Sequence, residues 1–167
     1  MTSSNMYLLE QGLNLLGQID DRLYRCVPAG LAKAGVGGHL RHCLDFYGSF
    51  LRGVGAGKID YDHRERNELV EKDRATAIEK IETTIAQLRR LALAEGGQVV
   101  LVKLEGEQAQ DSSAWARSSV SRELQFLLSH TVHHYALIAM LLRWQGFEPA
   151  LDFGVAPSTL KYWQAKA

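Results

Sequence analysis

Two histidines, His130 and His134, stand four residues apart within a long apolar segment. On an α-helix, side chains four positions apart project from one face, with Cβ atoms about 6 Å apart. Two imidazoles placed in this way can bind one metal ion, and a third histidine from a neighbouring helix would complete a set of three ligands. Such a set leaves coordination positions open for water or substrate, as a catalytic metal requires. The spacing therefore predicts a metal site.

The position of each histidine around the helix axis separates predicted ligands from their neighbours. His134 lies about 40° from His130, on an apolar arc that faces the core. The same arc carries three leucines, Leu127, Leu137 and Leu141. His133 lies on a more polar arc and is expected at the surface or in support of the ligands. No glutamate follows His130, which excludes the His-Glu-x-x-His metalloprotease motif.

The third histidine would come from the amphipathic segment between Val36 and Val54. Its apolar arc includes His39, whereas His42 lies at the edge of that arc, so periodicity alone leans slightly towards His39. Asp45, one turn after His42, is a candidate catalytic residue that could orient a ligand imidazole or accept a proton. An exposed helix charge is the alternative interpretation of Asp45.

Four amphipathic segments predict four long helices joined by short breaks. They run from Ser4 to Val27, from Val36 to Val54, from an N-cap at Asp73 to Gly96-Gly97, and from Val120 to Gln145. Residues 98–104 and 114–117 favour a small β-hairpin, and residues 158–164 a short helix. This pattern predicts an all-α four-helix bundle with a small β-hairpin insertion before the last long helix, in one domain over residues 1–167.

Composition excludes several classes of function. Lysine plus arginine and aspartate plus glutamate number 19 each, so the formal charge is zero and no basic footprint for nucleic acid or anionic membrane is expected. No signal peptide is evident, and no stretch reaches the roughly 18 apolar residues of a membrane span. Cys26 and Cys43 lack metal-ligand spacing and are expected as buried, reduced thiols, which predicts a cytoplasmic location.

A charged loop, Asp60 to Asn67, follows the second predicted helix. Within it, Tyr61, Arg64 and Arg66 are candidate contacts for an anionic substrate, because arginine holds a carboxylate with two parallel hydrogen bonds. The alternative is a loop fixed by ion pairs of its own aspartates.

The run from His39 to Tyr47, followed later by His130-Thr131-Val132-His133-His134, resembles the DinB/YfiT-like superfamily of proposed metalloenzymes. The likeness spans nearly the whole chain: four helices, a histidine on the second, and His-x-x-x-His on the fourth. It looks closest to a small bacterial branch marked by Asp60-Tyr61-Asp62-x-Arg64-x-Arg66 and by the tail from Asp152 to Tyr162.

The resemblance implies an up-down-down-up bundle that holds one metal through three histidines. It assigns the ligand of the second helix to His42, with His130 and His134 as the other two. Superfamily members include thiol-S-transferases that use mycothiol or bacillithiol, and maleylpyruvate isomerases. A set of three neutral nitrogens suits zinc, nickel or iron(II). The implied activity is transfer of a low-molecular-weight thiol, or a metal-assisted hydrolysis, on a small molecule.

Two other functions stay open at this point. A non-catalytic metal-binding or stress-response protein would close the site with a fourth ligand such as His39 or Asp45. A structural or interaction bundle would keep its histidines as hydrogen-bonded core residues. Homodimerisation through a helix face is a further expectation for a small bundle.

Overall fold

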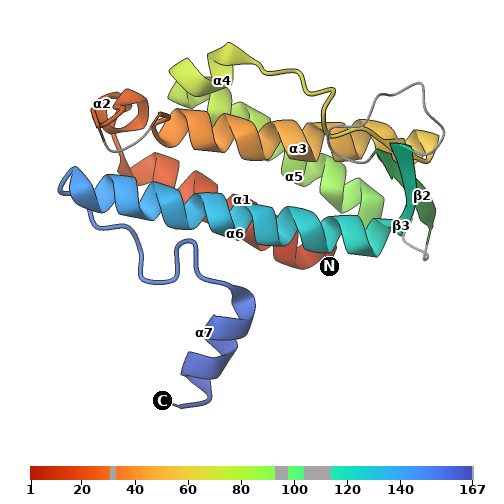
Figure 1. Cartoon of the computed structure of the whole chain (residues 1–167). Helices are drawn as coiled ribbons and strands as arrows, with labels where there is room; N and C mark the ends of the chain where they lie inside the picture. The colour runs from red at the N-terminus through yellow and green to blue at the C-terminus, as the bar shows by residue number, and fades with distance from the viewer. Residues whose placement is uncertain (31–32, 93–97, 104–113, 167) are drawn as a thin grey trace.

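The structure is a computed structural model that describes residues 1–30, 33–92, 98–103 and 114–166. The chain is mostly helical, with a small sheet at one end of the helices (Figure 1). Its helices are α1 (Thr2–Gln18), α2 (Asp21–Arg25), α3 (Val36–Ala56), α4 (Glu68–Lys72), α5 (Arg74–Ala92), α6 (Val120–Trp144) and α7 (Pro157–Gln164).

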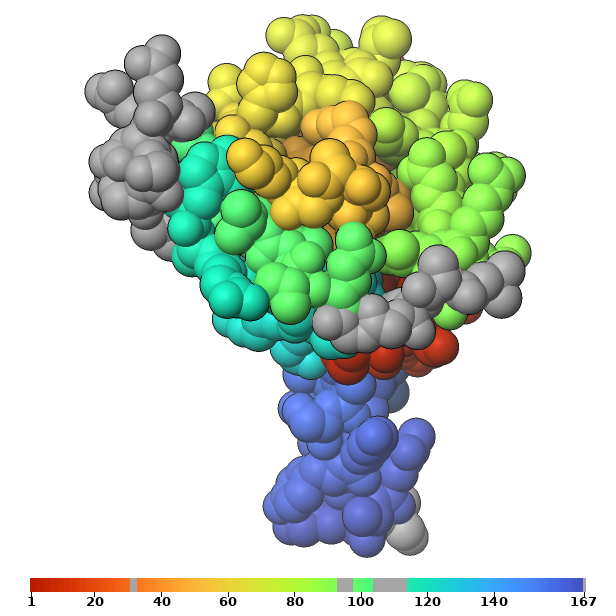
Figure 2. Space-filling view, turned by 90° about the vertical axis from the view of Figure 1, so that its right-hand side faces the viewer, coloured from red at the N-terminus to blue at the C-terminus, as the bar shows by residue number. Residues whose placement is uncertain are grey.

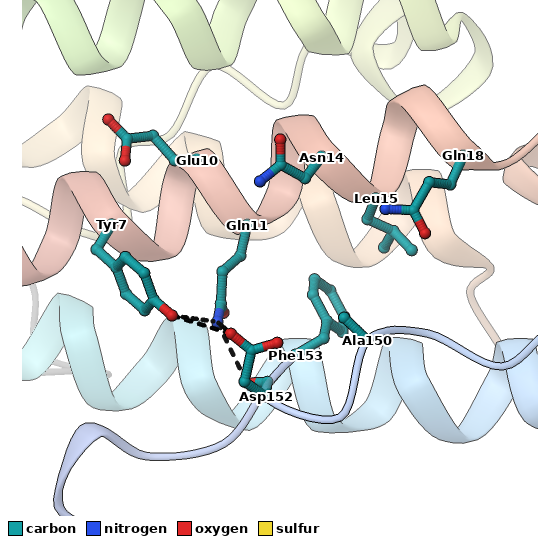
Figure 3. Close-up of a pocket in the computed structure, with 9 residues that line it drawn as sticks. All are labelled: Tyr7, Glu10, Gln11, Asn14, Leu15, Gln18, Ala150, Asp152 and Phe153. Atoms are coloured by element: carbon teal, nitrogen blue, oxygen red, sulfur yellow. Dashed lines mark hydrogen bonds between the residues drawn. The ribbon is translucent and has the colours of Figure 1, made fainter. Parts of the chain in front are cut away.

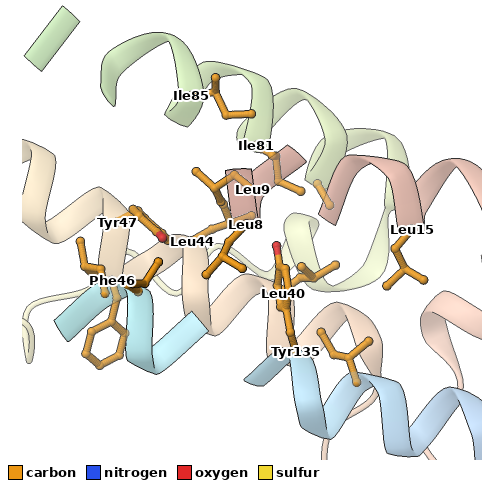
Figure 4. Packing of buried hydrophobic residues seen from close by; sticks show 14 of the residues in the cluster. Leu8, Leu9, Leu15, Leu40, Leu44, Phe46, Tyr47, Ile81, Ile85 and Tyr135 are labelled. Atoms are coloured by element: carbon orange, nitrogen blue, oxygen red, sulfur yellow. The ribbon is translucent and has the colours of Figure 1, made fainter. Parts of the chain in front are cut away.

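The four long helices pack side by side: α1 and α3 each contact both α5 and α6. Helices α1 and α6 run in one direction, and α3 and α5 run in the opposite direction (Figure 1). Their apolar faces meet in one buried cluster, because each helix repeats leucine, isoleucine or aromatic residues at helical spacing. Figure 4 shows members from all four helices, among them Leu8, Leu44, Tyr47, Ile81 and Tyr135.

A buried polar network fixes α3 against α6. The Tyr47 hydroxyl donates to Asn5 Oδ1 at 2.7 Å, and Thr131 Oγ1 lies 3.2 Å from the same hydroxyl. Asn5 in turn donates to the Leu124 carbonyl on α6 at 3.0 Å. Asn5 belongs to α1, so the network joins α1, α3 and α6. Buried polar groups stabilise a structure only when they are paired, and this network therefore favours a single alignment of these three helices. Thr131 directly follows His130, which ties the network to the predicted metal site.

The sheet has strand order β1-β2-β3, with strands at Lys58–Ile59, Val99–Lys103 and Trp115–Ser119. Strands β2 and β3 pair antiparallel, with Val99 opposite Ser119, as the sequence predicts within the described residues. The parallel pairing of β1 with β2 is not evident from the sequence, because two residues carry no periodicity. It depends on Gly53: a Cβ there would stand 2.4 Å from the Lys58 carbonyl oxygen. Only glycine allows β1 to return so close to α3.

The first predicted helix is divided in two. Helix α1 ends at Gln18, and α2 starts after Asp20, whose Oδ1 accepts a hydrogen bond from Leu23 N at 2.8 Å. Asp20 is a favourable N-cap, and this local interaction outweighs the apolar periodicity that continues through the break. Helix α4 is likewise an unpredicted single turn inside a polar region, with Asn67 as its N-cap.

The segment after α6 returns to α1 before the chain leaves the helical body. Asp152 Oδ2 accepts hydrogen bonds from Tyr7 at 2.9 Å and from Gln11 at 3.2 Å, beside a small pocket of about 140 Å³ (Figure 3). Phe153 stacks on Tyr135 with ring centroids 4.7 Å apart. Helix α7 then projects from the body and has no buried residue (Figure 2).

No helix within the described part of the chain combines the length and the apolar character needed to cross a membrane. Both cysteines are free thiols; Cys43 is buried as expected, but Cys26 is half-buried, since it lies at the exposed end of α2.

Candidate metal centre

Three histidines from two facing helices converge in the structure. His42 comes from α3, and His130 and His134 come from α6. Each offers a ring nitrogen that lies within 4.8 Å of the others, and all three side chains are half-buried. The structure thus brings together the three residues predicted as ligands; their role as ligands stays a prediction.

The spacing of the nitrogens suits a transition metal. Zinc–nitrogen bonds of about 2.0–2.1 Å in a tetrahedral site separate two nitrogen ligands by about 3.3 Å. His42 Nε2 and His130 Nε2 lie 3.2 Å apart. Three imidazoles form a borderline-soft donor set that fits zinc, nickel or iron(II) better than calcium or magnesium, which prefer oxygen.

Burial keeps the cluster neutral and ready to bind a cation. It lowers the pKa of His130 to about 4 and that of His134 to about 3; the neighbouring histidines add smaller downward contributions to both, and Arg64 adds one for His130. Burial also lowers the pKa of His42, with smaller contributions from Arg64 and Arg41. A neutral imidazole has a free lone pair, whereas a protonated one has none. At neutral pH these side chains therefore do not need to lose a proton before they bind a metal.

His39 lies beside the cluster rather than within it. Its Nδ1 is 3.0 Å from Nδ1 of His134, which leaves Nε2 of His134 for a metal. Metal-binding histidines commonly use the second ring nitrogen in this way, and the contact fixes the orientation of the imidazole. His133 is exposed, and its ring stands edge-on to His134 at 5.0 Å.

An aromatic wall closes one side of the cluster. The Phe46 ring lies 4.3 Å from the His130 ring, and Phe126 lies 5.7 Å from it, centroid to centroid. Tyr61 from the charged loop packs on both phenylalanines, at 5.3 and 5.2 Å. Sequence reasoning missed this wall, although Phe46 follows His42 by four positions and Phe126 precedes His130 by four. That spacing places each phenylalanine one turn from a histidine on the same helix face.

Of the three loop residues predicted to contact a substrate, Tyr61 and Arg64 lie at the aromatic wall, and Arg66 lies away from it. Arg64 lies over the Phe46 ring, 4.7 Å from its centroid, and donates to the Tyr61 carbonyl at 2.7 Å. The Tyr61 hydroxyl donates to Glu123 at 2.9 Å. Arg66 is exposed and has a positive φ of 51°, and the structure does not bring it to the histidines.

Ion pairs of the loop's own aspartates are also present, as the alternative interpretation predicts. Lys103 Nζ lies 3.6 Å from a carboxylate oxygen of Asp60 and 3.6 Å from one of Asp62. The loop is therefore fixed at its aspartates, while Tyr61 and Arg64 lie on the phenylalanines that border the histidine cluster.

Asp45 is buried, with 8% of its surface exposed, so it is not a solvent-exposed helix charge. Burial raises the pKa of its carboxyl group, and the positive charges of Arg41 and Arg64 partly oppose that shift. No hydrogen bond joins Asp45 to a histidine among the described residues. It stands one turn after His42. The positive charge of Arg64 acts on the Asp45 carboxyl group as well as on the His42 imidazole.

The sequence model of the DinB family matches residues 14–162, which is nearly the whole chain. The chain belongs to the DinB family. DinB membership and the cluster of three histidines are together compatible with a metal-binding protein.

A curated relative of this DinB protein is FK506-binding protein 5 of Rhizopus delemar, 36% identical over 108 residues. The match covers 62% of this chain but only 27% of the relative. The chain therefore spans about a quarter of the length of that protein, and the similarity concerns one part of it.

Proposed function

We propose that this protein is a metal-dependent enzyme of the four-helix-bundle type, with the up-down-down-up order that its helix directions suggest. His42, His130 and His134 would hold one divalent cation, with zinc, nickel and iron(II) as the candidates. The convergence of three neutral imidazoles from α3 and α6 carries the proposal. His39 pairs with His134 instead of joining the three-histidine group, which favours an open coordination position over a site closed by a fourth protein ligand.

The bound metal would lower the pKa of a thiol or a water molecule and so supply a nucleophile at neutral pH. Transfer of a low-molecular-weight thiol to an electrophilic small molecule is the reaction we favour, with hydrolysis as the related alternative. Zinc, nickel and iron(II) all bind thiolate sulfur and imidazole nitrogen, so the donor set supports both versions.

The remaining site residues are assigned roles from their surroundings. Asp45 would accept the proton released from the nucleophile, because a buried carboxyl with a raised pKa is a better base than an exposed one. Arg64 would hold an anionic group of the substrate, and Phe46 with Tyr61 would limit the access of water. Arg66 would reach the substrate only from the outer edge of the loop.

The partners in this proposal are a small-molecule substrate and a thiol cofactor, with no nucleic acid and no membrane. The zero formal charge of the chain supports that choice. Its free cysteines suit the reducing conditions of the cytoplasm, where we place the protein.

Metal content tests the proposal directly. Protein purified without a histidine tag, analysed by inductively coupled plasma mass spectrometry, is expected to hold about one zinc, nickel or iron per chain. His134→Ala should hold none. If neither protein holds metal after incubation with all three ions and dialysis, the enzyme proposal is wrong, and the histidines are ordinary core residues.

A metal-loaded protein then allows the reaction to be tested. Asp45→Asn should retain the metal but lose most thiol-transfer or hydrolytic activity against a panel of electrophiles. Equal activity in the variant and the wild type would remove Asp45 from the mechanism.

A further inference from the structure

A groove runs between α3 and α5, and we refer to it as the α3–α5 groove. Its volume of about 440 Å³ lies within the range of small-molecule sites, about 300–1,000 Å³. On α3, Gly48 stands six positions after His42 and so about 120° further around the helix axis. The groove and the histidine cluster therefore use different faces of α3. The residues that line the groove are Gly48, Leu51, Arg52, Val54, Glu65, Lys80, Gln87, Arg90 and Leu91.

The side chains that α5 contributes form a row along the groove. Lys80, Gln87 and Leu91 fall within about 40° of one another around the helix axis. Arg90 lies about 80° from Lys80 and so stands at the rim. The lysine ammonium group and the glutamine amide therefore point the same way, towards α3.

One carboxylate holds two cations of the groove close together. Arg52 Nη1 on α3 lies 2.7 Å from Glu65 Oε1, and Lys80 Nζ on α5 lies 3.5 Å from Glu65 Oε2. The second distance exceeds that of a good hydrogen bond, so the Lys80 ammonium has donors to spare. A single small anion can therefore reach both helices at this point.

Positive charge exceeds negative charge in the α3–α5 groove. Its lining carries three cations and one carboxylate, that of Glu65. Arg90 forms no ion pair with any residue in the ranges 1–30, 33–92, 98–103 and 114–166. The buried Asp45 carboxyl interacts with Lys80 from outside the lining. Even when Asp45 is counted, the cations outnumber the carboxylates, so the groove favours an anion.

The Glu65 carboxylate occupies the position that such an anion would take. It comes from the charged loop, and 49% of its side chain is exposed. Exposed ion pairs contribute little to stability, so a ligand of higher charge can replace this contact. A phosphate group carries up to two negative charges and three acceptor oxygens, which suits an arginine, a lysine and an amide better than a carboxylate does.

Gly48 leaves the groove open beside Arg52. Glycine in the middle of a helix is unfavourable relative to alanine. At Gly53 the close return of β1 explains the glycine, but a Cβ at Gly48 would meet only the end of the Arg52 side chain, with Nη1 at 3.2 Å. Packing therefore does not require a glycine at position 48, whereas space for a ligand next to the guanidinium group does.

We propose that the α3–α5 groove binds the phosphate group of a small organic phosphate, at a site separate from the metal. Arg52 and Lys80 would hold the phosphate, with Gln87 and Arg90 as further donors. The organic part would lie on the apolar lining, Leu51, Val54 and Leu91. This proposal does not depend on the proposed enzymatic function, because the histidines line no part of the groove.

The probe is 1-naphthylphosphonate, an aryl phosphate analogue that cannot be hydrolysed, titrated as the dianion into the tag-free full chain and followed by ligand fluorescence. Arg52→Gln combined with Lys80→Gln should weaken binding by at least about tenfold, since two charge-assisted contacts are lost. Arg89→Gln is the matched control. Arg89 is an exposed arginine of α5 outside the groove, so this change should leave the affinity as it is.

Glu65→Gln separates a binding site from a structural clamp. It removes the carboxylate that competes with the ligand, so the probe should bind several-fold more tightly than to the wild type. If Arg52 and Lys80 serve only to fix the charged loop, loss of Glu65 should leave the affinity unchanged or lower it. Either of those results would overturn the proposal.

Gly48→Leu tests the location by shape and keeps the proposal testable if the double variant does not fold. The leucine side chain would fill the groove beside Arg52 and should abolish binding of the probe. The melting temperature should not fall, because leucine is a better helix former than glycine and its Cβ meets no backbone atom. Unchanged binding in a folded Gly48→Leu protein would place the probe elsewhere.

Two further arms identify the ligand and the site. Inorganic phosphate should compete only weakly with the probe, because it makes no contact with the apolar lining; equal affinity would contradict an organic ligand. His134→Ala should lose metal but bind the probe as the wild type does. Loss of probe binding in His134→Ala would place the phosphonate at the histidine cluster and overturn the proposal, as would the absence of binding to the wild type.

Discussion

At the scale of single residues, the histidines of α3 and α6 are matched in pairs. His39 faces His134 and His42 faces His130, in the order that two antiparallel helices impose. Periodicity alone leans slightly towards His39, and the resemblance to the DinB/YfiT-like superfamily assigns the ligand to His42. In the structure both lie on the side of α3 that meets α6, and His39 contacts His134 while His42 belongs to the three-histidine group.

We expect His42→Ala and His130→Ala each to abolish stoichiometric metal binding, since two imidazoles are too few for a stable site of this kind. His133→Ala should leave binding largely intact, because that side chain is exposed and outside the cluster. Isothermal titration calorimetry with zinc measures the stoichiometry. Equal loss in His133→Ala would show that the ligand set is assigned incorrectly.

His39→Ala should have an intermediate effect. Loss of a group that orients a metal ligand typically lowers metal affinity by about 10- to 100-fold without removing the site. Competition with a chromophoric zinc chelator measures the affinity, and the stoichiometry at saturating zinc should stay that of the wild type. Complete loss of binding would make His39 a ligand, and an unchanged affinity would exclude a positioning role.

At the scale of elements, the sequence predicts α6 and the short helix α7 closely, but it misses the break between α1 and α2 and the short elements α4 and β1. Helix α6 is found within one residue of its expected bounds, because an apolar stripe, a serine N-cap and a C-terminal glycine all agree. Helices α2 and α4 have five residues each, too few for a period to be recognised. Strand β1 exists because Gly53 lets it approach α3, a tertiary cause that no local pattern contains.

The N-cap of α5, Asp73, is expected to make a contribution to stability that depends on pH. Asp73 Oδ2 accepts hydrogen bonds from Thr76 N and Thr76 Oγ1 at 2.8 and 2.5 Å, and these bonds lower the pKa of the carboxyl. A carboxyl with a lowered pKa in the folded state stabilises the fold above its ordinary pKa, near 4. That contribution is lost as pH falls through the lowered value.

Asp73→Ala should therefore lower the melting temperature by about 2–4 °C at pH 7, the usual effect of a lost N-cap in a domain of this size. The difference between wild type and variant should shrink as the pH is lowered below about 4. Thermal melts followed by circular dichroism across this range provide the measurement. A difference that stays constant with pH would mean that the charge of Asp73 contributes nothing.

At the scale of the whole molecule, α7 stands apart from the helical body that contains the histidine cluster (Figure 1). Removal of residues 157–167 should change the melting temperature by less than about 2 °C, because no residue of α7 is buried. Metal content should be unchanged. A large loss of stability on truncation would indicate that α7 packs against another chain in solution. That result would agree with the homodimer expected from the sequence.

The three-histidine cluster joins α3 to α6, so metal binding there would be linked to the stability of the whole fold. A ligand that binds only the folded state at one hundred times its dissociation constant adds about 2.7 kcal/mol. In a domain of this size, that raises the melting temperature by roughly 5–10 °C. Zinc should produce such a rise in the wild type, and a chelator should reverse it. His134→Ala should melt at the same temperature with and without zinc, because its α6 ligand pair is incomplete. A rise of equal size in His134→Ala would mean that zinc stabilises the chain somewhere other than between α3 and α6.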